Sequence, residues 1–266
     1  MAIGITGCGG RMGRMLIAEI EETAGCHVAG GIEAKASPVI GRDLGELAGL
    51  GALGVVAGDD PASLFASSDV VVDFTAPDAA VRHAAEAARQ GKPLVIGTTG
   101  LDAAGEAALL AAAKGTAIVH SPNMSLGVNL LLGLVRQVAA RLDDGYDIEI
   151  VEMHHRHKVD APSGTALALG REAAEARGID FSARSRRARD GITGERRRGD
   201  IGFAALRGGD VVGEHSVIFA AEGEQIVLTH RAGSRRIFAR GAVRAACWAV
   251  GRPPGLYGMK DVLGLG

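Results

Sequence analysis

The chain has 266 residues and a formal net charge of −2, from 29 Lys and Arg against 31 Asp and Glu. This balance gives no overall field that would hold the protein to nucleic acid or an anionic membrane. Hydrophobic residues make up 47%, which excludes a disordered protein, and the 40 glycines follow no triplet period, which excludes collagen. Cys8, Cys26 and Cys247 form no paired motif, so we expect neither disulfides nor structural zinc. No basic segment leads into an apolar stretch at the N-terminus and no apolar run approaches membrane-spanning length, so we expect a cytoplasmic protein.

Strands and helices alternate over roughly the first 120 residues. Short apolar runs predict strands at 1–6, 26–32, 70–74, 93–96 and 117–120, and helical spacing predicts helices at 13–23, 77–90 and 102–114. Such alternation is typical of parallel βαβ units. It predicts an α/β fold whose N-terminal part is a Rossmann-like, doubly wound parallel sheet.

The pattern changes after residue 125. We expect helices at 126–142 and 163–177 and strands at 147–155, 201–205, 211–221 and 225–232. These elements predict a smaller α+β domain with a mixed or antiparallel sheet. A last helix is expected at 237–250, before a tail rich in Gly and Pro.

A glycine-rich loop joins the first strand to the first helix. Gly7, Gly10 and Gly13 give the spacing G-x-x-G-x-x-G, whereas the stricter G-x-G-x-x-G would need glycine in place of Met12. Glycine lets backbone N–H groups approach a pyrophosphate at the positive end of a helix. Glu33 follows 20 residues after Gly13, where an acid meets the adenosine ribose. These features predict a nicotinamide dinucleotide; the alternative is a tight turn without a ligand.

The loop Gly97-Thr98-Thr99-Gly100 follows the strand expected at 93–96. Loops at the carboxyl ends of parallel strands line the ligand crevice, so we expect this one to border the nicotinamide end of the cofactor. An ordinary turn between a strand and a helix would have the same sequence character.

The densest chemistry lies between residues 152 and 165. If the strand stays extended, His154, Arg156 and Lys158 share one face, and His155 and His157 share the other. Cations that gain and lose protons suit an anionic substrate that must receive a proton. A solvated strand end is the alternative. A metal site is less favoured, because no carboxylate or thiolate completes a known ligand spacing.

Ser163-Gly164-Thr165 opens the following helix. Its first N–H groups suit a substrate carboxylate at the positive end of the helix dipole, and simple N-capping by Ser163 is compatible with that role.

Residues 182–198, further along the chain, contain seven arginines. A mobile, solvated loop near an anionic site is favoured there over a nucleic-acid arm, because no aromatic residues interleave.

The chain resembles the 4-hydroxy-tetrahydrodipicolinate reductase (dihydrodipicolinate reductase) family of lysine biosynthesis along essentially its whole length. The resemblance rests on segments 7–14, 73–75, 97–100, 123–129, 152–165, 193–195, 208–215 and 255–263. It implies an NAD(P)H-dependent oxidoreductase, of class EC 1.17.1.8, that reduces 4-hydroxy-tetrahydrodipicolinate after its dehydration to dihydrodipicolinate. It also implies a homotetramer built through the second domain, and a cofactor domain of residues 1–125 completed by 235–266. Residues 126–234 then form the substrate and oligomerisation domain.

The resemblance assigns roles to individual residues. His154 is expected to donate a proton with help from Lys158, and His155, Gly164 and Thr165 to hold the carboxylates of a cyclic dicarboxylate. The expected cofactor contacts are Gly7, Cys8, Gly9, Gly10, Arg11, Met12, Glu33, Gly97, Thr98, Thr99, Ser121, Pro122, Asn123 and Met124. No metal, nucleic-acid or membrane partner is expected.

Cofactor preference depends on the residues after the second strand. Glu33 favours NADH because a carboxylate accepts from ribose hydroxyls and repels a 2′-phosphate. Family members that use NADPH well often have arginine next, where this chain has Ala34. Lys35 and Arg11 offer partial compensation, so we expect activity with NADH and NADPH and a modest preference for NADH.

Two other functions remain open from the residues alone. One is another Rossmann-type amino-acid or semialdehyde dehydrogenase, which leaves the histidine-rich segment unexplained. The other is a redox-sensing, dinucleotide-binding regulator, supported only by the arginine-rich loop.

Overall fold

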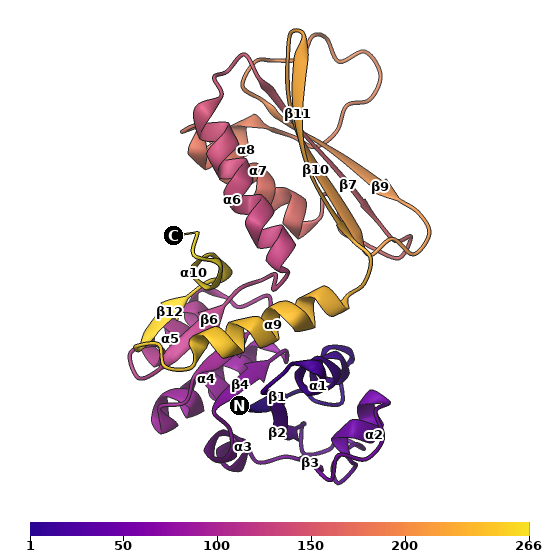
Figure 1. Cartoon of the computed structure of the whole chain (residues 1–266). Helices are drawn as coiled ribbons and strands as arrows, with labels where there is room; N and C mark the ends of the chain where they lie inside the picture. Colours follow the sequence, from indigo (N-terminus) through magenta and orange to yellow (C-terminus); the bar gives the residue numbers. More distant parts are fainter. Residues whose placement is uncertain (266) are drawn as a thin grey trace. The chain divides into compact units, whose positions relative to one another are not determined.

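The computed structural model describes residues 1–265, which form two compact units, each with its own sheet (Figure 1). Unit 1 comprises Met1–Leu126 and the chain from Arg236 onward, and unit 2 comprises Gly127–Arg235. These borders lie within one residue of the expected ones. The expectation of a doubly wound sheet followed by a second, mixed sheet is confirmed.

The sheet of unit 1 has seven parallel strands in the order β12-β6-β5-β4-β1-β2-β3. The strands are β1 (Ala2–Thr6), β2 (His27–Ile32), β3 (Ala57–Gly58), β4 (Val70–Asp73), β5 (Leu94–Ile96), β6 (Ala117–His120) and β12 (Gly255–Tyr257). The helices are α1 (Arg11–Glu22), α2 (Leu44–Ala48), α3 (Pro61–Ser67), α4 (Pro77–Gln90), α5 (Ala103–Ala112), α9 (Arg236–Ala249) and α10 (Met259–Leu263).

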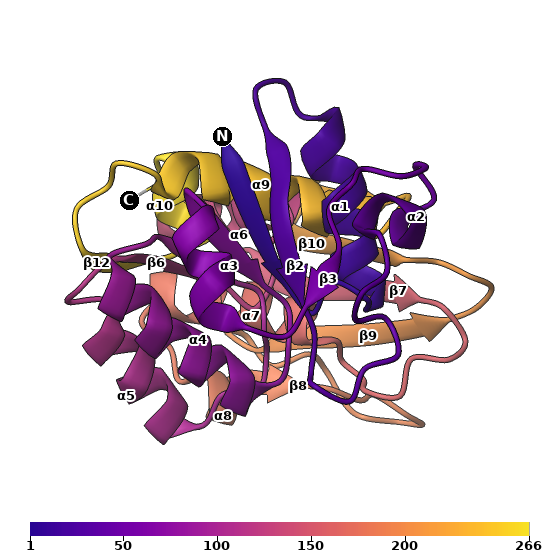
Figure 2. The same cartoon turned by 90° about the horizontal axis from the view of Figure 1, so that it is seen from below.

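Helices cover both faces of this sheet. Val70 and Val72 of β4 pack into a core with residues of α1 and α9, whereas Val71 packs with α3, α4 and α5. The side chains alternate because successive residues of a strand point to opposite faces. Figure 2 shows the same division, with α1 and α9 on one side of the strands and α3 and α4 on the other.

Several short elements were not expected from the sequence. They include α2, β3 and α3 between residues 44 and 67, and β12 and α10 in the tail that is rich in Gly and Pro. β12 pairs in parallel with β6 and lengthens the sheet at its edge. The last segment of the chain therefore completes unit 1.

Unit 2 contains a five-stranded mixed sheet in the order β11-β10-β7-β9-β8. Its strands are β7 (Asp147–His154), β8 (Ser185–Arg186), β9 (Ile201–Arg207), β10 (Gly213–Ala221) and β11 (Glu224–Ala232). β7 pairs antiparallel with β10 and parallel with β9. The helices α6 (Leu126–Arg141), α7 (Gly164–Ala176) and α8 (Phe181–Arg184) contribute to a core on one face with Ile148, Ile150, Val217 and Phe219.

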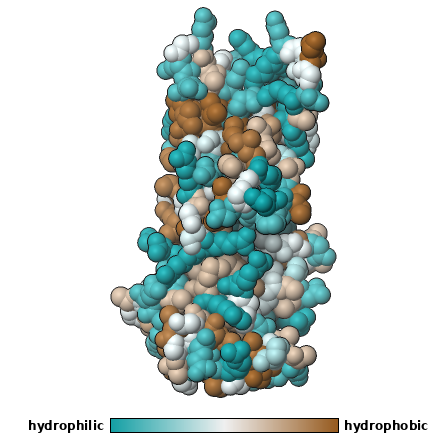
Figure 3. Space-filling view, turned by 90° about the vertical axis from the view of Figure 1, so that its right-hand side faces the viewer, coloured by the Kyte–Doolittle hydropathy of each residue, from teal (hydrophilic) through white to brown (hydrophobic). Residues whose placement is uncertain are grey.

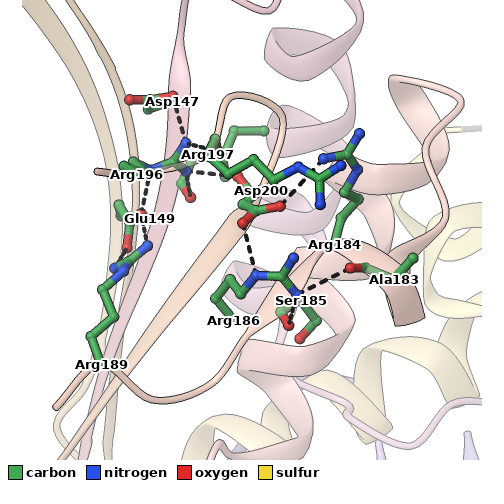
Figure 4. A network of polar contacts seen from close by, with 11 residues as sticks. Asp147, Glu149, Ala183, Arg184, Ser185, Arg186, Arg189, Arg196, Arg197 and Asp200 are labelled. Atoms are coloured by element: carbon green, nitrogen blue, oxygen red, sulfur yellow. Dashed lines mark hydrogen bonds and ion pairs between the residues drawn. The ribbon is translucent and has the colours of Figure 1, made fainter. Parts of the chain in front are cut away.

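The arginine-rich segment is not the free, solvated loop that we expected. Arg189 donates two hydrogen bonds of 2.7 Å to Glu149, and Arg196 reaches both Asp147 and Glu149 (Figure 4). Arg186 pairs with buried Asp200 at 2.8 Å. Carboxylates on β7 and at the start of β9 therefore hold these arginines, an arrangement that their sequence spacing could not show.

The cysteines and the helix lengths can be compared with what the composition predicts. Cys26 and Cys247 are free thiols whose Sγ atoms lie 3.8 Å apart, although 221 residues separate them. In the described part of the chain, no helix combines the length and apolar character needed to cross a membrane.

Candidate functional site

The glycine loop of unit 1 is closely packed. Gly7 adopts φ +74°, and a Cβ on Gly13 would lie 2.2 Å from the carbonyl oxygen of Gly7. α1 begins at Arg11, two residues before the expected start, so its first turn directly follows this loop. A cavity of about 700 Å³ lies beside the loop, lined by Gly7 and Gly10 among others. The loop and cavity give the tight approach that a pyrophosphate needs.

Glu33 lies at the end of β2 and lines this cavity. Its Oε1 accepts a 2.9 Å hydrogen bond from the N–H of Gly9, which fixes the carboxylate against the glycine loop. Burial, and then the charge of Glu33, raise the pKa of the Cys8 thiol to about 11, so Cys8 packs here as a neutral side chain. Lys35 and Arg82 line the same cavity, whereas Arg11 is exposed and does not.

A buried polar cluster supports the far wall of the cavity. Asp73, at the end of β4, accepts hydrogen bonds from Thr75, from Thr98 at 2.9 Å and from His83 Nδ1 at 2.5 Å. Burial raises the pKa of this carboxyl, but these contacts outweigh it and hold the pKa below its usual range. His83 and Thr75 both line the cavity. Asp73 thus anchors the loop that carries Thr98, and His83 holds Asp73 in turn. The sequence did not reveal either of these roles.

The remaining expected cofactor residues lie in the same unit. Gly97 follows β5, and a Cβ there would lie 2.2 Å from the ring of Phe74, so the loop passes close to the 74–76 segment. Thr99 is on that loop, and Ser121 to Met124 follow β6. Ser121 Oγ donates to the carbonyl of Asn123 at 2.9 Å, which makes a compact turn. All these loops leave the carboxyl ends of parallel strands, where ligands bind in such sheets.

Three features of unit 1 bear on whether a nicotinamide dinucleotide fits: the glycine loop, the acid after β2 and the adjoining cavity. The glycine backbone leaves no room for side chains between the loop and the first turn of α1. An acid stands at the end of β2, and the adjoining cavity is of cofactor size. The residues present therefore fit the group that the spacing predicts.

Unit 2 holds the histidine-rich segment at the end of β7. Glu152 and His154 are buried, and His154 Nδ1 lies 2.6 Å from Glu152 Oε2. Arg207 of β9 binds both oxygens of Glu152, at 2.8 and 2.9 Å. Burial raises the pKa of the Glu152 carboxyl, but the bonds from Arg207 and His154 outweigh this and lower it. Glu152 is therefore an anion held by donors on both of its oxygens.

The electrostatics favour a neutral His154 ring. Burial lowers the pKa of His154, the bond to Glu152 opposes this, and the charges of Lys158 and Arg207 lower it further, with a net decrease. The ring of His215 lies 5.0 Å away, edge on, and burial followed by the charge of His154 lowers the pKa of His215 to about 4. A lowered pKa makes protonated His154 a stronger acid.

The expected alternation of residues 154–158 is wrong, because β7 ends at His154 and a turn follows. The N–H of Lys158 donates to the carbonyl of His155, which closes the turn. Lys158 Nζ lies 2.7 Å from Asp160, and His155 Nε2 lies 3.3 Å from Arg235. The segment therefore forms a cationic loop and not two faces of a strand.

α7 begins at Gly164, directly after Ser163. Ser163 Oγ accepts from the N–H of Ala166, so the capping role is confirmed. His215 Nε2 lies 3.0 Å from the same hydroxyl, and the N–H of Ser163 donates to Glu152. The start of the helix, with Gly164 and Thr165, is thus tied to the carboxylate that holds His154. His215 and Arg207 are site residues that sequence reasoning missed.

Among residues 1–265, no three His, Cys, Asp or Glu side chains lie close enough together to hold a metal ion. Unit 1 has a cavity beside a glycine loop whose lining fits a dinucleotide, and unit 2 has the buried pair His154–Glu152 next to the start of α7. A reduction of an anionic substrate needs these two capabilities.

Comparisons with known proteins show which family the chain is similar to. Residues 1–124 match the family model described as dihydrodipicolinate reductase, N-terminus, and residues 127–263 match the corresponding C-terminus model. Proteins named 4-hydroxy-tetrahydrodipicolinate reductase from Chelativorans sp. and Rhodopseudomonas palustris are 59% and 57% identical. Their alignments cover 99% and 100% of this chain, and 96% and 97% of those proteins.

A solved structure shares the fold. The dipicolinate-bound dihydrodipicolinate reductase from Paenisporosarcina sp. TG-14 has a TM-score of 0.78 at 23% identity, over 98% of each chain. A probable dehydrogenase from Thermotoga maritima, at 11% identity, has a TM-score of 0.59 and covers 93% of that chain. Since family models match nearly the whole chain and the curated relatives exceed half identity over nearly their full length, the chain belongs to the dihydrodipicolinate reductase family, whose members include the 4-hydroxy-tetrahydrodipicolinate reductases.

Proposed function

We propose that this chain reduces 4-hydroxy-tetrahydrodipicolinate to tetrahydrodipicolinate with NAD(P)H, a step of lysine and diaminopimelate biosynthesis. The substrate is a cyclic dicarboxylate that first loses water to give dihydrodipicolinate. The activity is supported by relatives named for it. The mechanism rests on one observation: Glu152 occupies Nδ1 of His154, which leaves Nε2 for proton transfer.

The cofactor is held by unit 1 in this proposal. The loop from Gly7 to Met12 would hold the pyrophosphate against the N–H groups at the start of α1, at Arg11 and Met12, and Glu33 would accept from the adenosine ribose. Segments 97–99 and 121–124 contact the remainder. When bound, the nicotinamide supplies the hydride. The cavity beside Glu33 and the tight packing of the glycine loop support this assignment.

In this proposal, unit 2 donates the proton and binds the carboxylates of the substrate. Protonated His154 gives the proton on Nε2 to the reduced ring and is left neutral, so hydride plus proton completes the reduction. His155, Gly164 and Thr165 hold the substrate carboxylates, and the ammonium of Lys158 neutralises one of them. Preorganised donors of this kind stabilise charge without reorganisation during the reaction.

We propose that both cofactors are used, with a modest preference for NADH. Glu33 favours free ribose hydroxyls, and Ala34 supplies no guanidinium. Lys35 and Arg82 line the cavity with Glu33, so two cations partly offset its repulsion of a 2′-phosphate. Exposed pairs of this kind contribute only ~0–1 kcal/mol, which is too little to reverse the preference.

We also propose a homotetramer assembled through unit 2. The face of its sheet that α6 and α7 leave uncovered bears apolar side chains, among them Leu206 and Val227, which are 50% and 47% exposed. Figure 3 shows several hydrophobic side chains (brown) exposed on the surface of the molecule. Exposed apolar patches are typical of protein interfaces.

The proposed location is the cytoplasm. Free thiols are consistent with that reducing compartment.

The activity is tested with purified protein coupled to the synthase that makes the substrate, by following the loss of absorbance of the reduced nicotinamide. We expect oxidation that depends on substrate. In the same assay His154→Gln should lower kcat by roughly 10²–10⁴-fold, the usual contribution of a positioned acid, with the cofactor Kd unchanged. His157→Gln, an exposed neighbour, is the matched control. No substrate-dependent oxidation would refute the function, and a full kcat in His154→Gln would refute the mechanism.

A further inference from the structure

The carboxylate of Glu152 is the meeting point of three elements. It is 1% exposed and accepts four hydrogen bonds. Oε2 takes His154 Nδ1 at 2.6 Å and Arg207 Nη1 at 2.8 Å, and Oε1 takes Arg207 Nη2 at 2.9 Å and the N–H of Ser163 at 3.1 Å. Its partners therefore come from its own strand, from β9 and from the residue that caps α7.

These contacts leave the His154 ring a single orientation. Because Nδ1 is bound to Glu152, the Nε2 edge turns toward β10, where a Cβ on Gly213 would lie 3.0 Å from Nε2. The edge-on ring of His215 lies on the same side. A glycine at 213 gives that edge of the ring the room that any larger residue would fill.

We propose that Glu152 is a positioning residue that ties the proton donor His154 to the carboxylate-binding start of α7, and that Arg207 sets how firmly Glu152 holds the protonated ring. The inference rests on the proposed function, since it assigns the support of that same site. One carboxylate thus aligns the acid and the helix start together, so that a shift in either is transmitted to the other.

Opposing charges surround the His154 ring. Glu152 on β7 stabilises its protonated form, whereas Arg207 on β9 and Lys158 in the loop after β7 destabilise it. His215 on β10 faces the ring and is neutral at ordinary pH because burial lowers its pKa to about 4. Since Arg207 also shares Oε2 with His154, it both repels the protonated ring and competes for its acceptor.

The tests are Glu152→Gln and Arg207→Met, read as pH profiles of kcat. All partners of Glu152 are donors, so an amide in either orientation turns its N–H₂ toward a donor, and the protonated ring loses its counter-ion. The falling limb should move to lower pH by about one unit in Glu152→Gln. In Arg207→Met, Glu152 is freed for His154, and the limb should move to higher pH. Arg136→Met is the control, since the carboxylates that Arg136 pairs with are those of Glu172 and Glu175.

A merely structural role of Glu152 and Arg207 would not move the falling limb of the pH profile in opposite directions in the two variants. Limbs that move in the same direction in both variants, or stay in place, would overturn the proposal. Nitrogen-15 NMR of the histidine rings gives a readout without turnover: neutral His154 should carry its proton on Nδ1 in the wild type, and a proton on Nε2 would overturn the assignment. If His154→Gln keeps full activity while the Nδ1 tautomer is observed, the proposed chemistry fails and the positioning contact stands.

Discussion

His215 makes the stability of the protein depend on pH in a defined window. The residue is 4% exposed, and burial followed by the charge of His154 lowers its pKa from 6.5 to about 4. Between pH 6.5 and about pH 4, His215 therefore binds a proton in the unfolded chain but not in the folded chain. The contribution to stability is full above pH 6.5 and is lost as the pH falls toward 4.

The size of the effect follows from the shift. Between pH 7.5 and pH 5 it amounts to about 2 kcal/mol, and over the whole window to about 3 kcal/mol. His215→Gln keeps a polar partner for Ser163 but does not titrate, so this part of the acid sensitivity should vanish. The difference in unfolding free energy between wild type and variant should therefore narrow or reverse on acidification.

The measurement is urea unfolding followed by circular dichroism at pH 7.5, 6 and 5, at one protein concentration. His157→Gln serves as control, because His157 is exposed in the same unit. A wild type and a His215→Gln variant that lose equal stability between pH 7.5 and 5 would refute the reasoning.

Three further outcomes are expected. Gly13→Ala should abolish cofactor binding or folding, because its Cβ would lie 2.2 Å from the Gly7 carbonyl; a normal cofactor Kd by fluorescence titration would contradict this. Ala34→Arg should shift the ratio of kcat/KM toward NADPH, and a wild-type preference for NADPH of tenfold or more would contradict the role given to Glu33. Lys158→Ala should raise KM and lower kcat together, whereas small changes in both would make Lys158 a solvated charge paired with Asp160.

The main elements of both sheets could be predicted from the sequence because their signals are local. Apolar runs such as 70–74 and amphipathic helices such as 77–90 carry their own periodicity. β3 and β12, with two and three residues, are too short for any periodicity, and their pairing with β2 and β6 gives them their identity.

The site was predicted as far as it lies in continuous segments. His154 and the start of α7 are neighbours in sequence, so their association was visible. Arg207 and His215 come from β9 and β10, and only the pairing of these strands with β7 brings them to Glu152. The turn after His154 was missed because two of the backbone bonds that hold it, from His155 and Arg156, go to Val211 and Gly209, far along the chain.

The order of synthesis has a consequence for unit 1. Its first 126 residues leave the ribosome before unit 2, yet α9 and β12 are made after it. At roughly 5–20 residues per second, the delay is roughly 5–20 s. During that time the edge of β6 lacks β12, and Ile3, Ile5 and Val72 lack the cover of α9, against which they pack in the finished protein. The nascent chain thus presents an apolar sheet face and an open strand edge, the features that chaperones bind and that misfolded copies share.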